Sequence, residues 1–146
     1  MSSEDTKRHI FLVKANINSF INELLTRSKN HDKSKLESPE KEIFDKFTPL
    51  LKTSTYGTPE YFKTLGEMKE AIDHHYKNNF HHPEHYPNGI RGMSLIDIIE
   101  MFCDWSASTK RHEDGSLLKS IQLNKARFNY SDELEQIFLN TVKFLE

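Results

Sequence analysis

The chain contains a single cysteine, Cys103, so an internal disulfide is excluded. Proteins without disulfides are typical of reducing, intracellular compartments. The N-terminus lacks the apolar core of a signal peptide, and no apolar run approaches the roughly eighteen residues that cross a bilayer. We therefore expect a cytoplasmic protein with no membrane partner.

An excess of positive charge is also absent. Twenty Lys and Arg residues are balanced by 22 Asp and Glu residues, which leaves a formal net charge of −2. Because the lysines are scattered among acids, the sequence offers no broad basic surface for duplex nucleic acid. A small anionic substrate bound at a local site is compatible with this balance.

Several motifs that would indicate other chemistries are missing. The chain has no glycine-rich phosphate loop, no Gly-x-Ser-x-Gly nucleophile elbow and no Cys-x-x-Cys pair. It also has no strand-like alternation, internal repeat or low-complexity tract. These absences argue against nucleotide-binding P-loop proteins, serine hydrolases and dithiol redox proteins.

The composition is that of one globular domain spanning residues 1–146. Hydrophobic residues make up 36% of the chain, charged residues 29% and aromatic residues 11%, a balance unlike that of disordered or membrane proteins. Ten phenylalanines predict an aromatic core. The polar residues 1–5 are expected to be disordered.

Apolar residues recur at helical spacing along most of the chain, which predicts an all-α bundle of about five to seven helices. Ser38-Pro39-Glu40 and Thr58-Pro59-Glu60 each place a hydroxyl before proline, a signal for a helix start, and Ser94 with Asp97 forms a capping-box pattern. The last helix is amphipathic and could cap the core or pair with a second copy, so both a monomer and a homodimer are open. Helices are expected near residues 10–28, 94–111, 117–123 and 131–145. Two more are expected to start near residues 39 and 59, and the second of these carries an apolar stripe that ends at His75.

Histidines and aspartates form the most distinctive pattern. His31 and Asp32 are adjacent, and an adjacent pair can place imidazole and carboxylate on one divalent metal ion. Asp104 lies within an apolar helix, where an unpaired buried carboxylate would cost several kcal/mol. Mixed imidazole and carboxylate ligands favour a transition metal over calcium. Residues 74–85 add five histidines, namely His74, His75, His81, His82 and His85.

Three segments resemble the HD-domain superfamily of metal-dependent phosphohydrolases. His31-Asp32-Lys33-Ser34-Lys35 is similar to the His-Asp-x-Gly-Lys segment of its two-metal members, with Ser34 in place of glycine. Residues 74–85 and Asp97-Ile-Ile-Glu-Met-Phe-Cys-Asp-Trp105 resemble, more narrowly, a family of small HD-like proteins of bacteria and phages. The resemblance therefore implies a helical HD-like domain in a bacterial or phage-infected cell.

The resemblance also implies one or two divalent transition metal ions, with Fe, Mn, Ni, Co and Zn as candidates. One ion would take His9, His31, Asp32 and Asp104, and a second would share Asp32 and add imidazoles from residues 74–85. Within that cluster we expect His75, which continues a buried stripe, and His82, with His74 and His81 as alternatives. A solvent-facing histidine-rich loop is the competing interpretation.

Further residues are candidates for contacting the substrate. Lys35 lies one helical turn after Asp32, so its ammonium could bind a phosphate oxygen, and we expect Lys35 and Asp32 to be catalytic. Arg111 would share the helix face of Asp104 two turns on. Each of these cations could instead be an ordinary solvated charge. The remaining expected substrate contacts are Arg27, Asn78 and Asn79.

The resemblance implies hydrolysis of a phosphomonoester or phosphodiester, with a nucleotide or a nucleotide-derived signal as substrate. Two metal ions would lower the pKa of a water molecule and clamp the attacked phosphoryl group. Two alternatives stay open. Some HD-fold proteins are di-iron oxygenases, and a chain with Ser34 in place of glycine could also be a catalytically silent nucleotide-binding module.

Overall fold

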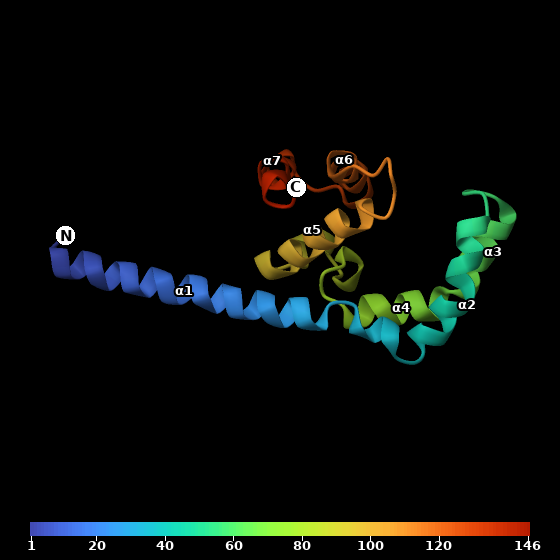
Figure 1. The fold of residues 1–146 in the computed structure, drawn as a ribbon, viewed down its shortest axis with the longest axis horizontal. Helices are drawn as coiled ribbons and strands as arrows, with labels where there is room; N and C mark the ends of the chain where they lie inside the picture. Colours follow the sequence, from blue (N-terminus) through green and yellow to red (C-terminus); the bar gives the residue numbers. More distant parts are fainter.

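The protein is all-helical in a computed structural model that describes residues 1–146. Seven α-helices and four short 3₁₀ turns are present, with no strand, which confirms the predicted fold class and helix number (Figure 1). None of the helices combines the length and the apolar character needed to cross a bilayer. The helices are α1 (Ser3–Asn30), α2 (Glu40–Thr53), α3 (Pro59–Glu67), α4 (Lys69–Asn78), α5 (Leu95–Thr109), α6 (Leu117–Phe128) and α7 (Asp132–Thr141).

The N-terminal residues are helical, so the prediction of disorder over residues 1–5 is wrong. Helix α1 begins at Ser3 because Ser2 and Asp5 form a reciprocal capping box. The Ser2 side chain accepts a hydrogen bond from the Asp5 N–H, and the Asp5 carboxylate accepts one from the Ser2 N–H, both at 3.1 Å. Two otherwise free donors of the first turn are thereby satisfied.

The first half of α1 projects away from the rest of the molecule (Figure 1). No residue of this helix is buried, and its apolar stripe is open to solvent, with Ile10 60% and Phe20 52% exposed. Only the C-terminal end of α1 packs against α5. The predicted apolar stripe of α1 is present, but over most of its length no other segment of the chain packs against it.

Two of the three predicted caps start helices, and Ser131 caps the last helix. Thr58 accepts from the Tyr61 N–H, Ser94 and Asp97 form the expected capping box, and Ser131 accepts from the Leu134 N–H. The predicted cap at Ser38 is wrong. Helix α2 begins at Glu40 with Pro39 in the capping position, after a cis peptide bond, and no side chain caps it.

The stripe expected to end at His75 is buried as predicted, although the helix is interrupted. Helices α3 and α4 meet at Met68, which is 4% exposed, and the buried face continues through Ala71 and His75. His75 therefore reaches the interior from the last turns of α4.

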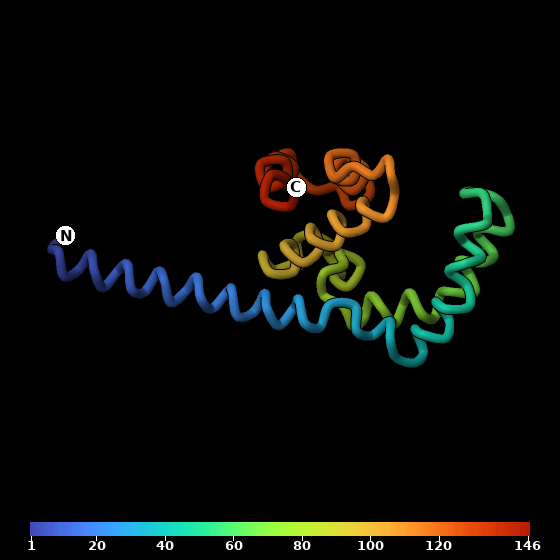
Figure 2. The backbone as a smooth tube through the Cα atoms, in the orientation of Figure 1, coloured from blue at the N-terminus to red at the C-terminus, as the bar shows by residue number.

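The core is aromatic, as predicted, and lies between α5, α6 and α7. The rings of Phe102 and Phe138 stack with centroids 5.0 Å apart, and Trp105 packs edge-on against Phe138. Ile121 and Met101 complete the buried centre. Helix α7 therefore covers the core of its own chain (Figure 2).

Replacing Phe138 by alanine is expected to lower the free energy of unfolding by about 3–5 kcal/mol, because the change opens a cavity in this core. Urea unfolding monitored by circular dichroism measures the loss. The neighbouring Ile137 is 58% exposed and serves as the matched control, for which we expect a change below about 1 kcal/mol. Equal losses in the two variants would contradict this placement of the core.

Candidate metal centre

Four segments that are distant in sequence converge beside the middle of α5. The end of α1 contributes His31 and Asp32, α4 contributes His75, and Asp104 comes from α5. The loop after α4 contributes the adjacent pair His81 and His82. Two groups of potential ligand atoms result, each with all atoms within 4.8 Å of one another: Asp32, His75, His81 and His82, and His31, His81 and Asp104.

The backbone at Asp32 turns the chain into this site. Asp32 has φ +53° and ψ 17°, a left-handed conformation that few residues other than glycine and asparagine or aspartate adopt. Asp32 follows His31, the C-cap residue of α1, and starts the 3₁₀ turn Lys33–Leu36. The reversal directs the Asp32 carboxylate toward His75 and His81, at 3.3 and 3.4 Å from their Nε2 atoms.

These separations match those between ligands of one metal ion. Two atoms each about 2.1 Å from an ion, at angles of 90–110°, lie about 3.0–3.4 Å apart. The distances from Asp32 Oδ1 to the Nε2 atoms of His75 and His81 fall in or at the edge of this range. His81 Nε2 also lies 3.5 Å from Asp104 Oδ2, and His31 Nε2 lies 3.8 Å from Asp104 Oδ1.

The imidazoles turn Nε2 inward and Nδ1 toward a second set of carboxylates. His75 Nδ1 lies 2.7 Å from Glu40 Oε1, and His31 Nδ1 lies 3.1 Å from Glu100 Oε2. His81 Nδ1 is 2.6 Å from the same Glu100 oxygen. Such carboxylates fix the tautomer of metal-binding histidines and leave the Nε2 lone pair free to coordinate.

Three buried atoms of the site have no hydrogen-bond partner, whereas buried polar atoms in proteins are nearly always paired. Asp32 Oδ1 and His81 Nε2 face inward, and the third is His81 Nδ1, whose contact with Glu100 is an ion pair without hydrogen-bond geometry. The Nε2 atoms of His75 and His82 face each other at 3.0 Å, so they need a proton or a cation between them. A divalent cation would satisfy all four groups at once, and the donor set therefore fits a metal ion.

The charges of the site are strongly coupled. Burial alone would lower the pKa of His81, but Asp104, Asp32 and Glu100 outweigh burial and raise it to about 11. Burial and the neighbouring His81 and His75 lower the pKa of His82 to about 3. Burial would raise the pKa of Asp32, yet His75, His81 and Lys35 hold it far below its usual range. Without a metal ion, His81 is thus the cation that the carboxylates surround.

Arg27 supports this arrangement from α1. Its Nη1 donates to Asp97 Oδ1 at 2.7 Å and to Glu100 Oε1 at 3.3 Å. Tyr86 donates to the other Asp97 oxygen at 2.6 Å. The guanidinium of Arg27 thus positions Glu100 behind His31 and His81. Arg27 also borders the pocket between α1 and α5, and its contact with substrate stays a prediction.

His9 is not part of the site, which corrects the sequence prediction. It lies on the exposed, projecting half of α1, in the same uninterrupted helix that ends just before His31. At 1.5 Å per residue, the 22 positions from 9 to 31 span about 33 Å. One ion cannot bind both imidazoles within this chain.

The histidine cluster divides differently from the expectation. His75 and His82 both lie in the site, but His81, taken only as an alternative, is the most buried of them at 1% exposed and belongs to both ligand groups. The other alternative, His74, lies outside the ligand groups. Its Nδ1 is 2.7 Å from Glu40 Oε2, so it helps to hold the carboxylate behind His75.

Most of the residues predicted to contact substrate are hydrogen-bonded within the chain. Lys35 lies 2.7 Å from Asp32 Oδ2, and Asn79 donates to Ser34 and to the His75 carbonyl. Asn78 is exposed and donates to the His74 carbonyl. Arg111 is exposed beyond the end of α5 at Thr109, so the predicted two-turn alignment with Asp104 fails.

Glu40 and Glu100 were missed by sequence reasoning. Glu100 had a usable signal, because Asp97, Glu100 and Asp104 recur at helical spacing on one face of an otherwise apolar helix. Glu40 had none, since an acid in the first turn of a helix is ordinarily exposed, whereas here it is fully buried.

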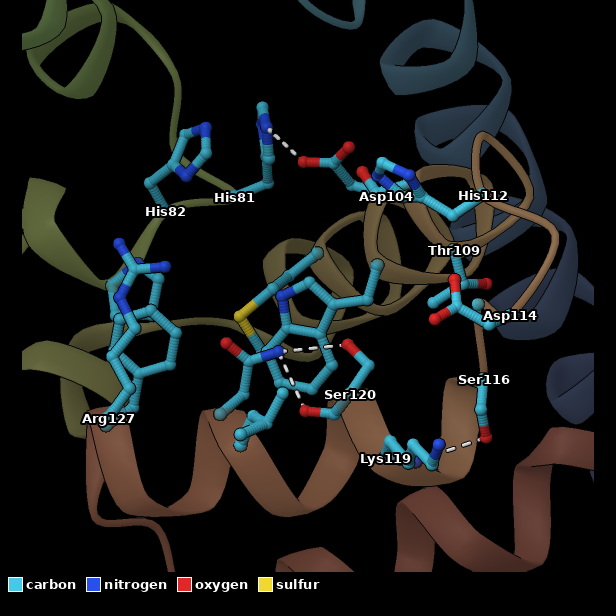
Figure 3. A pocket seen from close by; sticks show the side chains of 18 of the residues that line it. His81, His82, Asp104, Thr109, His112, Asp114, Ser116, Lys119, Ser120 and Arg127 are labelled. Carbon is cyan, nitrogen blue, oxygen red and sulfur yellow. Dashed lines mark hydrogen bonds and ion pairs between the residues drawn. The ribbon is translucent and has the colours of Figure 1, made fainter. Parts of the chain in front are cut away.

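Two pockets open beside the ligand residues. One of about 650 Å³ is bordered by His81, His82 and Asp104 on one side and by α6 on the other (Figure 3). A second, of about 550 Å³ and mainly apolar, lies between α1 and α5 and reaches His31 and Asp104. Cys103 borders the second pocket, where burial raises the pKa of its thiol and so disfavours the nucleophilic thiolate.

His81→Ala and Asp32→Asn are expected to lose bound divalent transition metal, whereas wild type retains at least one equivalent. Each change removes an inward-facing ligand atom from the cluster. Elemental analysis of purified, metal-reconstituted protein measures the content. His9→Ala is the control and should bind metal like wild type, and loss of metal in this variant instead would contradict the location of the site.

Metal binding at pH 7 is expected to release at least about one proton, because His81 carries one in the metal-free protein and must lose it to coordinate. Since its pKa is raised to about 11, apparent metal affinity should rise as pH increases from 6 to 8. His82, with a lowered pKa, is already neutral and adds no proton. Calorimetry in buffers of different ionisation enthalpy measures the release, and a value of zero would contradict these charges.

Comparison with known proteins gives one match. Residues 1–146 match the model of a family described as Family of unknown function (DUF5662), and this description makes no link to the HD-domain superfamily. No curated protein matches the chain, and no solved structure does. Since the match covers the whole chain, the protein belongs to the DUF5662 family.

Proposed function

We propose that this protein is a metal-dependent phosphohydrolase that cleaves a phosphomonoester or phosphodiester, with nucleotides or nucleotide-derived molecules as the substrate class. The main support is the buried cluster in which Nε2 atoms and carboxylate oxygens face one another beside a polar pocket. The likeness of residues 31–35 to the His-Asp-x-Gly-Lys segment of HD-type phosphohydrolases adds to it.

The residues that would hold the metal form two overlapping groups. When bound, one or two divalent transition metal ions would lower the pKa of a coordinated water and polarise the phosphoryl group. The mixed donor set suits Fe, Mn, Ni, Co or Zn better than calcium or magnesium, which prefer oxygen ligands. The proposed ligands are His31, Asp32, His75, His81, His82 and Asp104.

The surrounding residues would keep these ligands in position. Glu100 lies within 3.1 Å of both His31 and His81, and Arg27 in turn binds Glu100. Lys35 forms an ion pair with Asp32, which helps to keep that carboxylate ionised. Because these partners are in place before any substrate arrives, little rearrangement would accompany the reaction.

The pocket beside His81, His82 and Asp104 favours an anionic ester over an apolar substrate. Its wall carries the cations Lys119 and Arg127 together with several hydroxyl groups. A phosphate ester is such an anion, so the proposed hydrolase accounts for the cations of this wall, and the metal-dependent assays below distinguish it from a di-iron oxygenase.

Wild type, reconstituted with each candidate metal, is expected to release phosphate from at least one nucleotide in a screen of mono-, di- and cyclic nucleotides. Asp104→Asn should reduce the rate at least about a hundredfold, because bound metal supplies several kcal/mol of transition-state stabilisation. Phosphate release is measured colorimetrically.

His9→Ala is the matched control and should hydrolyse at the wild-type rate, since it also removes an imidazole, but one that lies far from the site. Equal rates in wild type and Asp104→Asn would defeat the proposal. Substrate-dependent oxygen uptake by the iron form, without phosphate release, would replace it by an oxygenase.

A further inference from the structure

One face of α6 forms the wall of the larger pocket opposite the ligand residues (Figure 3). From the N-cap residue Ser116 onward, its pocket-lining positions are spaced by 3, 1, 3, 1, 3 and 1 residues, which places them on one side of the helix. Leu117 and Ile121 point instead into the core. The lining residues are Ser116, Lys119, Ser120, Leu123, Asn124, Arg127 and Phe128.

Arg127 marks the end of this wall that is tied to the metal ligands. Its Nη2 donates to Glu84 Oε1 at 2.7 Å, and Glu84 lies in the 3₁₀ turn Pro83–His85 directly after His82. In Figure 3, Arg127 and His82 both lie at the left of the view, on opposite walls of the pocket. A guanidinium has five donors, so the Glu84 contact leaves others free for a phosphoryl oxygen.

Lys119 marks the other end. It forms no ion pair, and eight residues of helix separate it from Arg127, a rise of about 12 Å. Around it the pocket carries the hydroxyls of Ser116 and Ser120 and the carboxylate of Asp114. This end thus offers both donors and acceptors, as groups with several hydroxyls require.

We propose that this face of α6 recognises the substrate, with Arg127 contacting the phosphoryl group and Lys119 contacting a polyhydroxylated leaving group. The ligand class is a phosphate ester of a sugar, either free or as part of a nucleoside. Asn124 and Ser120 lie between the two cations and supply further hydrogen bonds along the leaving group. This inference rests on the proposed function, because it places the phosphoryl group beside the ligands His81, His82 and Asp104.

Trp105 makes occupancy of the pocket directly measurable. It is the only tryptophan in the chain, and it borders the pocket. Its fluorescence can be titrated with non-hydrolysable phosphonate analogues, so binding is measured without turnover. The probes are phosphonate analogues of a nucleoside monophosphate and of a pentose phosphate, with methylphosphonate and benzylphosphonate as simple and apolar comparisons.

The two sugar-containing phosphonates are expected to bind wild type about tenfold more tightly than methylphosphonate or benzylphosphonate. Arg127→Gln should weaken all four probes about tenfold. Lys119→Gln should weaken only the two sugar-containing probes. Lys125→Gln is the matched control, since Lys125 lies on the same helix outside the pocket and pairs with Asp132, and it should bind like wild type.

Wild-type affinities in both Arg127→Gln and Lys119→Gln would overturn the inference, as would equal binding of benzylphosphonate and the sugar-containing probes. Tighter binding of the nucleoside probe than of the pentose probe would support it and add recognition of the base. Binding that depends on both residues without any hydrolysis supports the inference while defeating the phosphohydrolase. Hydrolysis that neither variant changes overturns the inference alone.

Discussion

Buried carboxylates and imidazoles facing one another are the constraint on which the site depends. Asp32, Asp104 and Glu100 converge on His81, which is almost fully buried. Such a group of charges is costly in the protein interior unless each is paired. A divalent cation among the Nε2 and carboxylate atoms would provide that pairing. Without it the proton on His81 provides that pairing together with Lys35 beside Asp32 and Arg27 beside Glu100, and Asp32 Oδ1 is left without a hydrogen-bond partner.

The same cluster holds together parts of the molecule that otherwise share few contacts. The end of α1, the end of α4, the loop after it and α5 meet at the ligand residues, while the aromatic core lies separately between α5, α6 and α7. Helix α5 belongs to both regions, through Asp104 on one face and Phe102 on another, and Ile90 and Met93 of the loop after α4 also pack against the aromatic core. A metal ion bound there would therefore stabilise tertiary structure as well as supply chemistry.

The surroundings of the centre are organised in layers. Glu40 and Glu100 hold the imidazoles from behind, and Arg27 holds Glu100. Beyond the ligands, one polar pocket is bounded by α6, and one apolar pocket is bounded by α1. Under the proposed function, Asp104 of α5 would help to bind the metal, and side chains of α6 would recognise the ester. The projecting half of α1 contributes nothing to the site of its own chain.

The sequence by itself determined the helices, most of their caps, the aromatic character of the core and the importance of His31, Asp32, His75 and Asp104. These features depend on neighbours within a few residues, or on which face of one helix is apolar, and such information is local. Only the tertiary structure decided that His81 is the central histidine, that His9 is remote and that Glu40 is buried. Those outcomes depend on where separate segments cross, because the left-handed turn at Asp32 and the packing of α1 against α5 set which side chains meet.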